Sequence, residues 1–132
     1  MTSMNGTFFN GKVEEATLPL ADGEMGILAH HDEAAIAIVP GEISIRTPDG
    51  QTRVWVVSEG FANVANNRMK VIVYSAEKPE EVDINSAMEE EERAIEEMRQ
   101  QKNREEYRSA QISLARAMAR LAGAKKYKSL GD

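Results

Sequence analysis

Residues 70–100 of the chain read KVIVYSAEKPEEVDINSAMEEEERAIEEMRQ, and within this stretch one type of secondary structure gives way to another. The run Lys70–Tyr74 is rich in β-branched and aromatic residues, which is typical of a strand. From Asp83 onward the stretch is rich in alanine, glutamate, arginine and methionine, which favour a helix. Asp83 or Asn85 can cap the start of that helix. The change near Ala76 predicts strands before it and helices after it.

The part before this change consists of short apolar runs separated by turn signals such as Asp22-Gly23 and Pro40-Gly41. In EISIR (residues 42–46), Ile43 and Ile45 point to one face of a strand and the polar residues to the other. This pattern predicts an antiparallel β-sandwich or barrel. The expected strands are Lys12–Leu18, Ala35–Val39, Glu42–Arg46, Arg53–Val57, Phe61–Ala65 and Lys70–Tyr74.

The part after the change predicts two helices, at about residues 84–101 and 105–123, joined by a turn at QQKNR (residues 100–104). Gly123 is expected to weaken the end of the second helix. The chain is therefore an α+β protein with a sandwich domain at 1–82 and an antiparallel two-helix hairpin at 83–132. The apolar stripes expected at the helix contact are Ile84, Ala87, Met88, Glu91, Ile95 and Met98, and Tyr107, Gln111, Leu114, Met118 and Leu121.

Composition excludes several classes of function. The chain has 132 residues and a net charge of −6, which does not favour nucleic-acid binding. It has no cysteine, so disulfides, thiolate metal sites and cysteine nucleophiles are excluded. No apolar run has the ~20 residues that a membrane helix needs, and we expect a soluble protein without a signal peptide.

Charge is distributed unequally between the two predicted helices. The first helix and the segment before it are strongly acidic, and the second is basic from Lys102 to Lys128. Two interpretations are open. The helices are two solvated surfaces that attract each other weakly, at ~0–1 kcal/mol per pair, or the second helix is a detachable basic arm.

The stretch LADGEMGILAHH (residues 20–31) contains both histidines of the chain, but it does not have the pattern of a chemical site. Adjacent histidines point to opposite faces of an extended chain, and a zinc site needs three or four converging ligands. No phosphate loop and no Gly-x-Ser-x-Gly elbow is present. We expect a hairpin with conformationally demanding glycines that exposes Glu24, His30 and His31 at one end of the sandwich.

Five segments, in order, resemble the epsilon chain family of bacterial F-type ATP synthases, called delta in the mitochondrial naming. They are VEEATLPLADGEMGILAHH, IVPGEISIR, VVSEGFANV, SAEKPEEVDINSA and SLARAMARL, and they extend over almost the whole chain. The resemblance implies a sandwich of about ten strands, the first one shortened, followed by a helical hairpin.

The resemblance also implies a non-catalytic central-stalk (rotor) subunit that couples proton translocation to ATP synthesis and inhibits ATP hydrolysis. It would lie on the cytoplasmic face of a bacterial membrane without inserting into it. The implied partners are the gamma subunit, the c-ring, through Glu24 and His31, and the beta subunit. The residues implied for the beta contact, made when the hairpin extends, are Arg108, Arg116, Arg120, Lys125 and Lys126.

Some members of the family bind ATP in the folded hairpin. The matching positions here are Glu77, Val82, Asp83, Ala87, Arg93, Arg116 and Arg120, but Ser86 replaces an arginine of the motif. Because a charge-assisted contact contributes ~1.5–3 kcal/mol, we expect ATP binding to be weak or absent, and no cofactor to be required. The alternative function is a standalone ATP-sensing module that uses the helical hairpin. The third hypothesis is an independent hydrolase.

Two further departures from the family pattern affect turns. LAHHD lacks the proline and glycine of Pro-Gly-His, so a different turn is expected there. Glu59 replaces a glycine, which argues against a left-handed backbone at that position.

Overall fold

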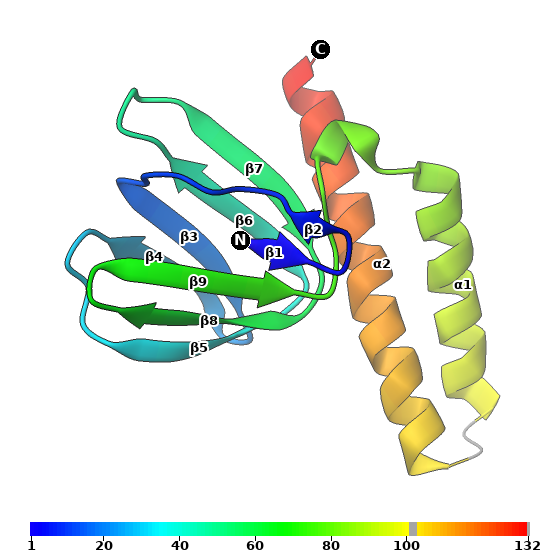
Figure 1. The fold of residues 1–132 in the computed structure, drawn as a ribbon. Helices are drawn as coiled ribbons and strands as arrows, with labels where there is room; N and C mark the ends of the chain where they lie inside the picture. The colour runs from blue at the N-terminus through cyan, green and yellow to red at the C-terminus, as the bar shows by residue number, and fades with distance from the viewer. Residues whose placement is uncertain (101–102, 132) are drawn as a thin grey trace. The chain divides into compact units, whose positions relative to one another are not determined.

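The computed structural model describes residues 1–100 and 103–131, with side chains through residue 127, and it divides into two compact units, Met1–Lys78 and Pro79–Asp132. The first unit contains the strands and the second the helices (Figure 1). The division falls after Lys78 rather than after residue 82. The short 3-10 helix η1 (Pro79–Glu81) contacts the second helix, and Val82 after it is buried, so both belong with the helices.

The first unit is the predicted β-sandwich, built from two five-stranded sheets. One sheet has the order β2-β1-β9-β8-β5 and the other β10-β7-β6-β3-β4 (Figure 1). All pairings are antiparallel except that of β1 with β9. The strands are β1 (Thr2–Ser3), β2 (Gly6–Thr7), β3 (Glu15–Leu20), β4 (Gly23–Leu28), β5 (Ala34–Ile38), β6 (Gly41–Arg46), β7 (Thr52–Val57), β8 (Gly60–Ala65), β9 (Arg68–Val73) and β10 (Ala76–Glu77).

The inward positions of these strands form one hydrophobic core. Leu18, Ile43, Ile45 and Val71 are its largest fully buried side chains. Trp55 closes the core toward the N-terminal segment, where the ring centroids of two phenylalanines, residues 8 and 9, lie 5.3 and 5.7 Å from its own. The alternation of buried and exposed residues along β5, β6 and β9 confirms the period of two expected for half-buried strands.

The second unit is a pair of antiparallel helices that pack against each other, α1 (Ile84–Gln100) and α2 (Arg104–Gly131). The Asp83 carboxylate accepts a hydrogen bond from the Ser86 N–H at 3.1 Å, so Asp83, one of the two predicted caps, is the N-cap of α1. Residues 101 and 102, which the prediction placed at the end of the first helix and in the turn, lie outside the described residues.

The predicted end of the second helix at residue 123 is wrong, because α2 continues to Gly131. A glycine inside a helix costs about 1 kcal/mol relative to alanine. Gly123 and Ala124 are both buried, so tertiary packing offsets that cost.

Candidate functional site

The segment around Glu24 forms the predicted hairpin, and its second strand, β4, is one that the sequence analysis did not list among the expected strands. Leu20 pairs with Gly23 across a two-residue turn, and Gly23 has a φ of 128°, which glycine adopts without strain. The strand β4 then pairs with β3 in register, with Met25 half-buried and Ile27 buried toward the core. The weak strand propensity of its two glycines and Glu24 concealed it, but the period-two pattern of Met25 and Ile27 was present.

The two histidines follow the other end of β4. His30 has a φ of 63°, a left-handed conformation, and its N–H donates a hydrogen bond of 2.7 Å to the Asn67 side chain. It is the middle residue of Ala29-His30-His31, where the family pattern has the glycine of Pro-Gly-His. A histidine thus adopts here the left-handed conformation that glycine favours. The expectation for Glu59 is confirmed, since no positive φ occurs there.

Glu24 and His31, which were expected at the same end of the sandwich, lie apart along β4 and the turn after it. Glu24 is the second residue of β4, and His31 lies three residues beyond its last residue, Leu28. A strand rises about 3.3 Å per residue, so more than about 13 Å of chain separates them. Glu24 is exposed beside the β3–β4 turn and His31 is half-buried. The prediction that Glu24 and the histidines share one end of the sandwich is wrong, because β4 is extended.

The contact between the helices is a regular heptad seam. Its positions follow a spacing of three and four, and each is buried or half-buried: Ile84, Ala87, Glu91, Ala94 and Met98 on α1, and Tyr107, Ala110, Leu114, Ala117, Leu121 and Ala124 on α2. The five alanines are 0–4% exposed, whereas the larger seam residues are half-buried. We call these eleven residues the alanine seam.

The predicted stripes overlap the alanine seam only in part. Met88, Ile95 and Met118 were expected in the contact but are 50%, 37% and 55% exposed, and Gln111 is exposed too. The sequence prediction favoured large apolar residues over alanine. The strict spacing of seven residues between the alanines on each helix was the signal that could have corrected it.

An ion pair shows which residues of the two helices lie side by side. The Arg120 Nη1 lies 3.4 Å from the Glu90 Oε2, with side chains 22% and 30% exposed. Glu90 and Arg120 each precede a seam residue, Glu91 and Leu121, so they lie on the same side of the seam. One heptad further along α1 and one heptad back along α2, the same register places Glu97 beside Ser113.

The five basic residues predicted to contact a partner do not form one patch. Arg108, Lys125 and Lys126 are exposed, whereas Arg116 and Arg120 are half-buried. The residues of the predicted nucleotide site differ in exposure and in their contacts. Glu77 belongs to the sandwich unit, Val82 and Ala87 are buried, Arg93 is exposed, and two of the others are engaged, Asp83 as a helix cap and Arg120 with Glu90.

The sandwich exposes a row of side chains that the sequence analysis did not single out. The register of the sheet aligns Ala37 with Phe61, Phe61 with Ile72, and Ile72 with Thr2. Phe61 and Ile72 are 54% and 41% exposed. We call these four residues the outer row. Its signal in the sequence is an apolar residue at the outward position of a strand, as at Ile72 between buried Val71 and Val73.

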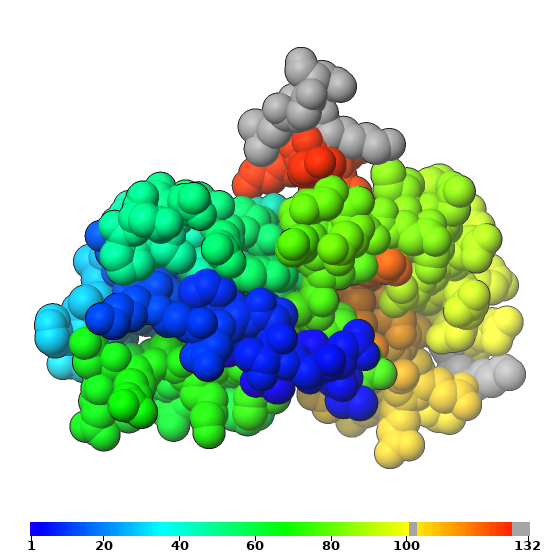
Figure 2. All heavy atoms as spheres, turned by 45° about the horizontal axis from the view of Figure 1, so that its top comes forward, coloured from blue at the N-terminus to red at the C-terminus, as the bar shows by residue number. Residues whose placement is uncertain are grey.

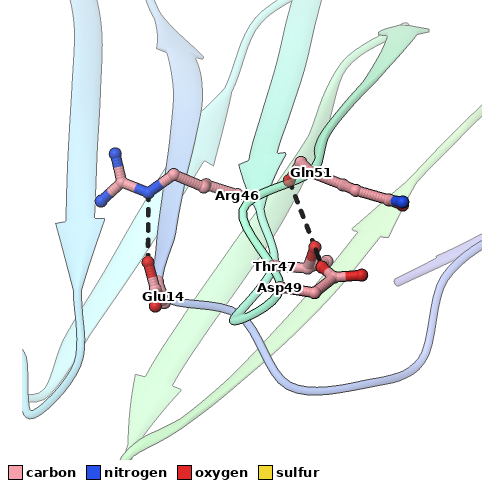
Figure 3. Close-up of polar contacts among 5 residues, drawn as sticks. All are labelled: Glu14, Arg46, Thr47, Asp49 and Gln51. Carbon is pink, nitrogen blue, oxygen red and sulfur yellow. Dashed lines mark hydrogen bonds and ion pairs between the residues drawn. The ribbon is translucent and has the colours of Figure 1, made fainter.

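A tight turn joins β6 to β7 close to an exposed ion pair between Glu14 and Arg46 at 3.3 Å (Figure 3). The Thr47 hydroxyl donates a hydrogen bond to the Asp49 carboxylate and lies 3.2 Å from the Gln51 carbonyl oxygen. The hydrogen bond from Thr47 holds the pKa of Asp49 below its ordinary value. These contacts account for the turn and involve none of the predicted site residues.

Two searches of the described part of the chain gave negative results. Within residues 1–100 and 103–131, no three histidine, aspartate or glutamate side chains are grouped so that they could hold a metal ion. Over the same residues, neither helix is both long and apolar enough to cross a membrane.

Comparison with known families gives two adjacent matches that together cover nearly the whole chain. Residues 1–79 match the beta-sandwich domain of the ATP synthase Delta/Epsilon chain, and residues 80–125 match its long alpha-helix domain. The boundary between the matches lies one residue from the division between the two structural units.

Individual relatives of this chain are ATP synthase epsilon chains. The ATP synthase epsilon chain of Ruminiclostridium cellulolyticum is 38% identical over 115 residues, which are 87% of this chain and 85% of that one. The epsilon chain of Caldanaerobacter subterraneus subsp. tengcongensis is 37% identical over 124 residues, 93% of this chain and 89% of that one.

Among solved structures, a chain of the Euglena gracilis mitochondrial ATP synthase, OSCP/F1/c-ring, has the same fold. The TM-score is 0.76 at 23% identity, covering 92% of this chain and 77% of that one. The matches to both domains, in the order and at the boundary that the structure has, show that this chain belongs to the ATP synthase delta/epsilon chain family.

Proposed function

We propose that this chain is a non-catalytic central-stalk subunit of an F-type ATP synthase, peripheral on the cytoplasmic face of the membrane. Its sandwich binds the gamma subunit and the c-ring, which couples proton translocation to ATP synthesis. Its helical hairpin opens, and α2 then contacts the beta subunit and inhibits ATP hydrolysis. Membership of the delta/epsilon family supports the assignment to the complex.

The alanine seam is the observation that carries the regulatory part of the proposal. Burying a methyl or methylene group contributes about 0.8 kcal/mol, so the five alanine methyl groups contribute about 4 kcal/mol, to which the six larger seam residues add only through the part of each side chain that is buried, before the entropy of ordering is subtracted. The fully buried core of the sandwich, in contrast, uses leucine, isoleucine and valine. A contact of this size permits an open state that a partner can stabilise.

The positive charge of α2 suits an acidic partner for the open hairpin. Arg108, Lys125 and Lys126 are exposed in the closed hairpin, and opening removes Arg120 from Glu90. A separated basic helix attracts an acidic surface of the beta subunit over several ångströms, which raises the rate of association.

Two surfaces of the sandwich are candidates for its partners. Glu24 is exposed beside the β3–β4 turn and can accept hydrogen bonds from basic loops of the c-ring, whereas His31 would contribute a separate contact. The outer row presents Phe61 and Ile72, which suit a desolvated contact with the gamma subunit. An acidic replacement of Phe61 should weaken gamma binding and leave the core intact.

ATP binding to the hairpin is the second candidate function, and we expect it to be weak or absent. A bound phosphate group would compete with Glu90 for Arg120, and Ser86 adds no cation. Isothermal titration of the full chain with ATP tests this, and tight binding would contradict it.

The decisive experiment measures ATP hydrolysis by a purified alpha-beta-gamma sector with added full-length chain. Glu97→Cys with Ser113→Cys introduces two thiols into a chain that has none, at positions that the register places side by side. A cleavable thiol cross-linker then holds the hairpin closed. We expect no inhibition while the cross-link is intact and recovery of inhibition once it is cleaved.

Two arginine variants complete the design. Arg116→Ala with Arg120→Ala should relieve inhibition, and Arg104→Ala, an exposed arginine at the start of α2, is the matched control that should not. Equal inhibition by the locked and the cleaved hairpin would contradict the proposal.

A further inference from the structure

One side of the helical hairpin exposes large apolar side chains next to the alanine seam. Met88 and Ile95 on α1 and Met118 on α2 each follow a buried seam alanine, namely Ala87, Ala94 and Ala117. They are 50%, 37% and 55% exposed. We call Met88, Ile95 and Met118 the methionine flank.

The three side chains lie on the same side of the hairpin. In an antiparallel pair of helices, residues that follow the seam on both helices border one flank, and residues that precede it border the other. The Glu90–Arg120 ion pair, at 3.4 Å, occupies the preceding side. The methionine flank is therefore on the opposite side, and the register places Met88 beside Met118 and Ile95 beside Gln111.

The surroundings of the methionine flank are small or basic. Ala115 and Ala122 are exposed and lie three residues before and four residues after Met118, so they leave room for another backbone to approach. The charged residues at the edge of this surface are Arg99, Arg108 and Lys125, against two carboxylates, Glu92 and Glu96. Arg99 also pairs with Glu96 at 3.8 Å, although both of those side chains are mostly exposed. This edge is net positive in a chain whose net charge is −6.

We infer that the methionine flank of the closed hairpin is a docking site for a third helix, supplied by a partner protein. The partner helix is amphipathic, places apolar residues between α1 and α2 at heptad spacing, and carries acidic residues along its edges. Helix-in-groove recognition uses such apolar anchors, and flexible methionine side chains adapt to the incoming residues. The basic edge selects the acidic flanks of the partner.

This inference stands beside the proposed function and does not depend on it. The inhibitory contact needs the open hairpin, whereas the methionine flank exists only when α1 and α2 are packed together. A hairpin locked by the cross-link between Glu97→Cys and Ser113→Cys should therefore lose inhibition but keep this site. A failure of one proposal can be distinguished from a failure of the other.

The test uses the full chain and a fluorescently labelled designed helix of three heptads, about 21 residues, with leucine at the apolar positions and glutamate at the flanking ones. A second peptide has lysine in place of each glutamate. We expect the glutamate peptide to bind in fluorescence anisotropy and the lysine peptide to bind at least about tenfold more weakly.

Two variants of the chain test whether the peptide binds at the methionine flank. Ile95→Glu with Met118→Glu should weaken binding of the glutamate peptide by about tenfold or more. Ile112→Glu is the matched control, because Ile112 is 40% exposed and lies on the face of α2 away from the seam. It should change binding less than about twofold, with the circular dichroism of all chains unchanged.

Three outcomes would overturn the inference. They are no measurable binding of the glutamate peptide, equal binding of the lysine peptide, and an equal loss of binding in the Ile112→Glu control.

Discussion

Enlarging one alanine of the seam should open the hairpin. Ala117 lies at the middle of the α2 part of the seam, between Leu114 and Leu121, and is 0% exposed. Ala117→Leu adds three carbon atoms at a fully buried position where the two helices meet. The side chain can be accommodated only if α1 and α2 separate or shift along each other.

The size of the effect follows from the cost of overpacking, which is typically about 1–3 kcal/mol in a well-packed contact. Because each 1.4 kcal/mol is a factor of ten, the ratio of open to closed hairpin should rise about 5- to 150-fold. The helix propensities of alanine and leucine differ by only a few tenths of a kcal/mol, so the stability of α2 itself barely changes.

Hydrogen exchange read by mass spectrometry measures the opening directly, and inhibition of ATP hydrolysis in the alpha-beta-gamma sector measures its consequence. Ala115→Leu is the matched control, since Ala115 is exposed on the same helix two residues away. Ala117→Leu should exchange faster along α1 and inhibit at lower concentration than the control. Equal exchange in the two variants would refute the argument that the alanine seam holds the hairpin closed.

Three further predictions concern the sandwich. Gly60→Ala should lower the free energy of unfolding by about 3 kcal/mol or more, because its Cβ would lie 2.1 Å from the Ile72 carbonyl oxygen. Thermal unfolding measures this loss, with Gly26→Ala as the control, because a Cβ at residue 26 meets nothing within 4 Å. His30→Gly should stabilise the fold by about 0.5–1 kcal/mol in urea unfolding, since its φ of 63° suits glycine. The lowered pKa of Asp49 means that its carboxylate stabilises the folded state above its ordinary pKa of 3.8 and that this contribution is lost as the pH falls through the lowered folded value; Asp49→Asn should therefore be less stable than the parent only at the higher pH.

The sandwich was largely predictable because its strands alternate. Six expected runs correspond to β3 and β5 through β9, and a strand with one buried face leaves a period of two in the sequence. The strand β4 was missed because two glycines lower its propensity, and only pairing with β3 makes it a strand. A partner strand is long-range information that a local pattern does not contain.

The candidate site was less predictable, for two physical reasons. Distance along the chain does not give distance in space, so Glu24 and His31, seven positions apart, were placed together although β4 extends between them. The left-handed backbone of His30 was also hidden, because a residue type indicates only a preference and the local sequence does not show the hydrogen bond from the His30 N–H to the Asn67 side chain.

The error in the predicted helix stripes bears on how the hairpin works. A helix contact is usually recognised by its largest apolar residues, yet here the seam buries alanines and leaves Met88, Ile95 and Met118 at 37–55% exposure. The closed hairpin thus leaves uncovered some of the apolar surface that could stabilise it, and the buried methyl groups contribute little. A partner that covers those three side chains favours the closed hairpin, whereas an acidic surface that binds the exposed cations of a separated α2 favours the open one. Because the hairpin's own packing is small, either partner can decide the state with a difference of a few kcal/mol in affinity.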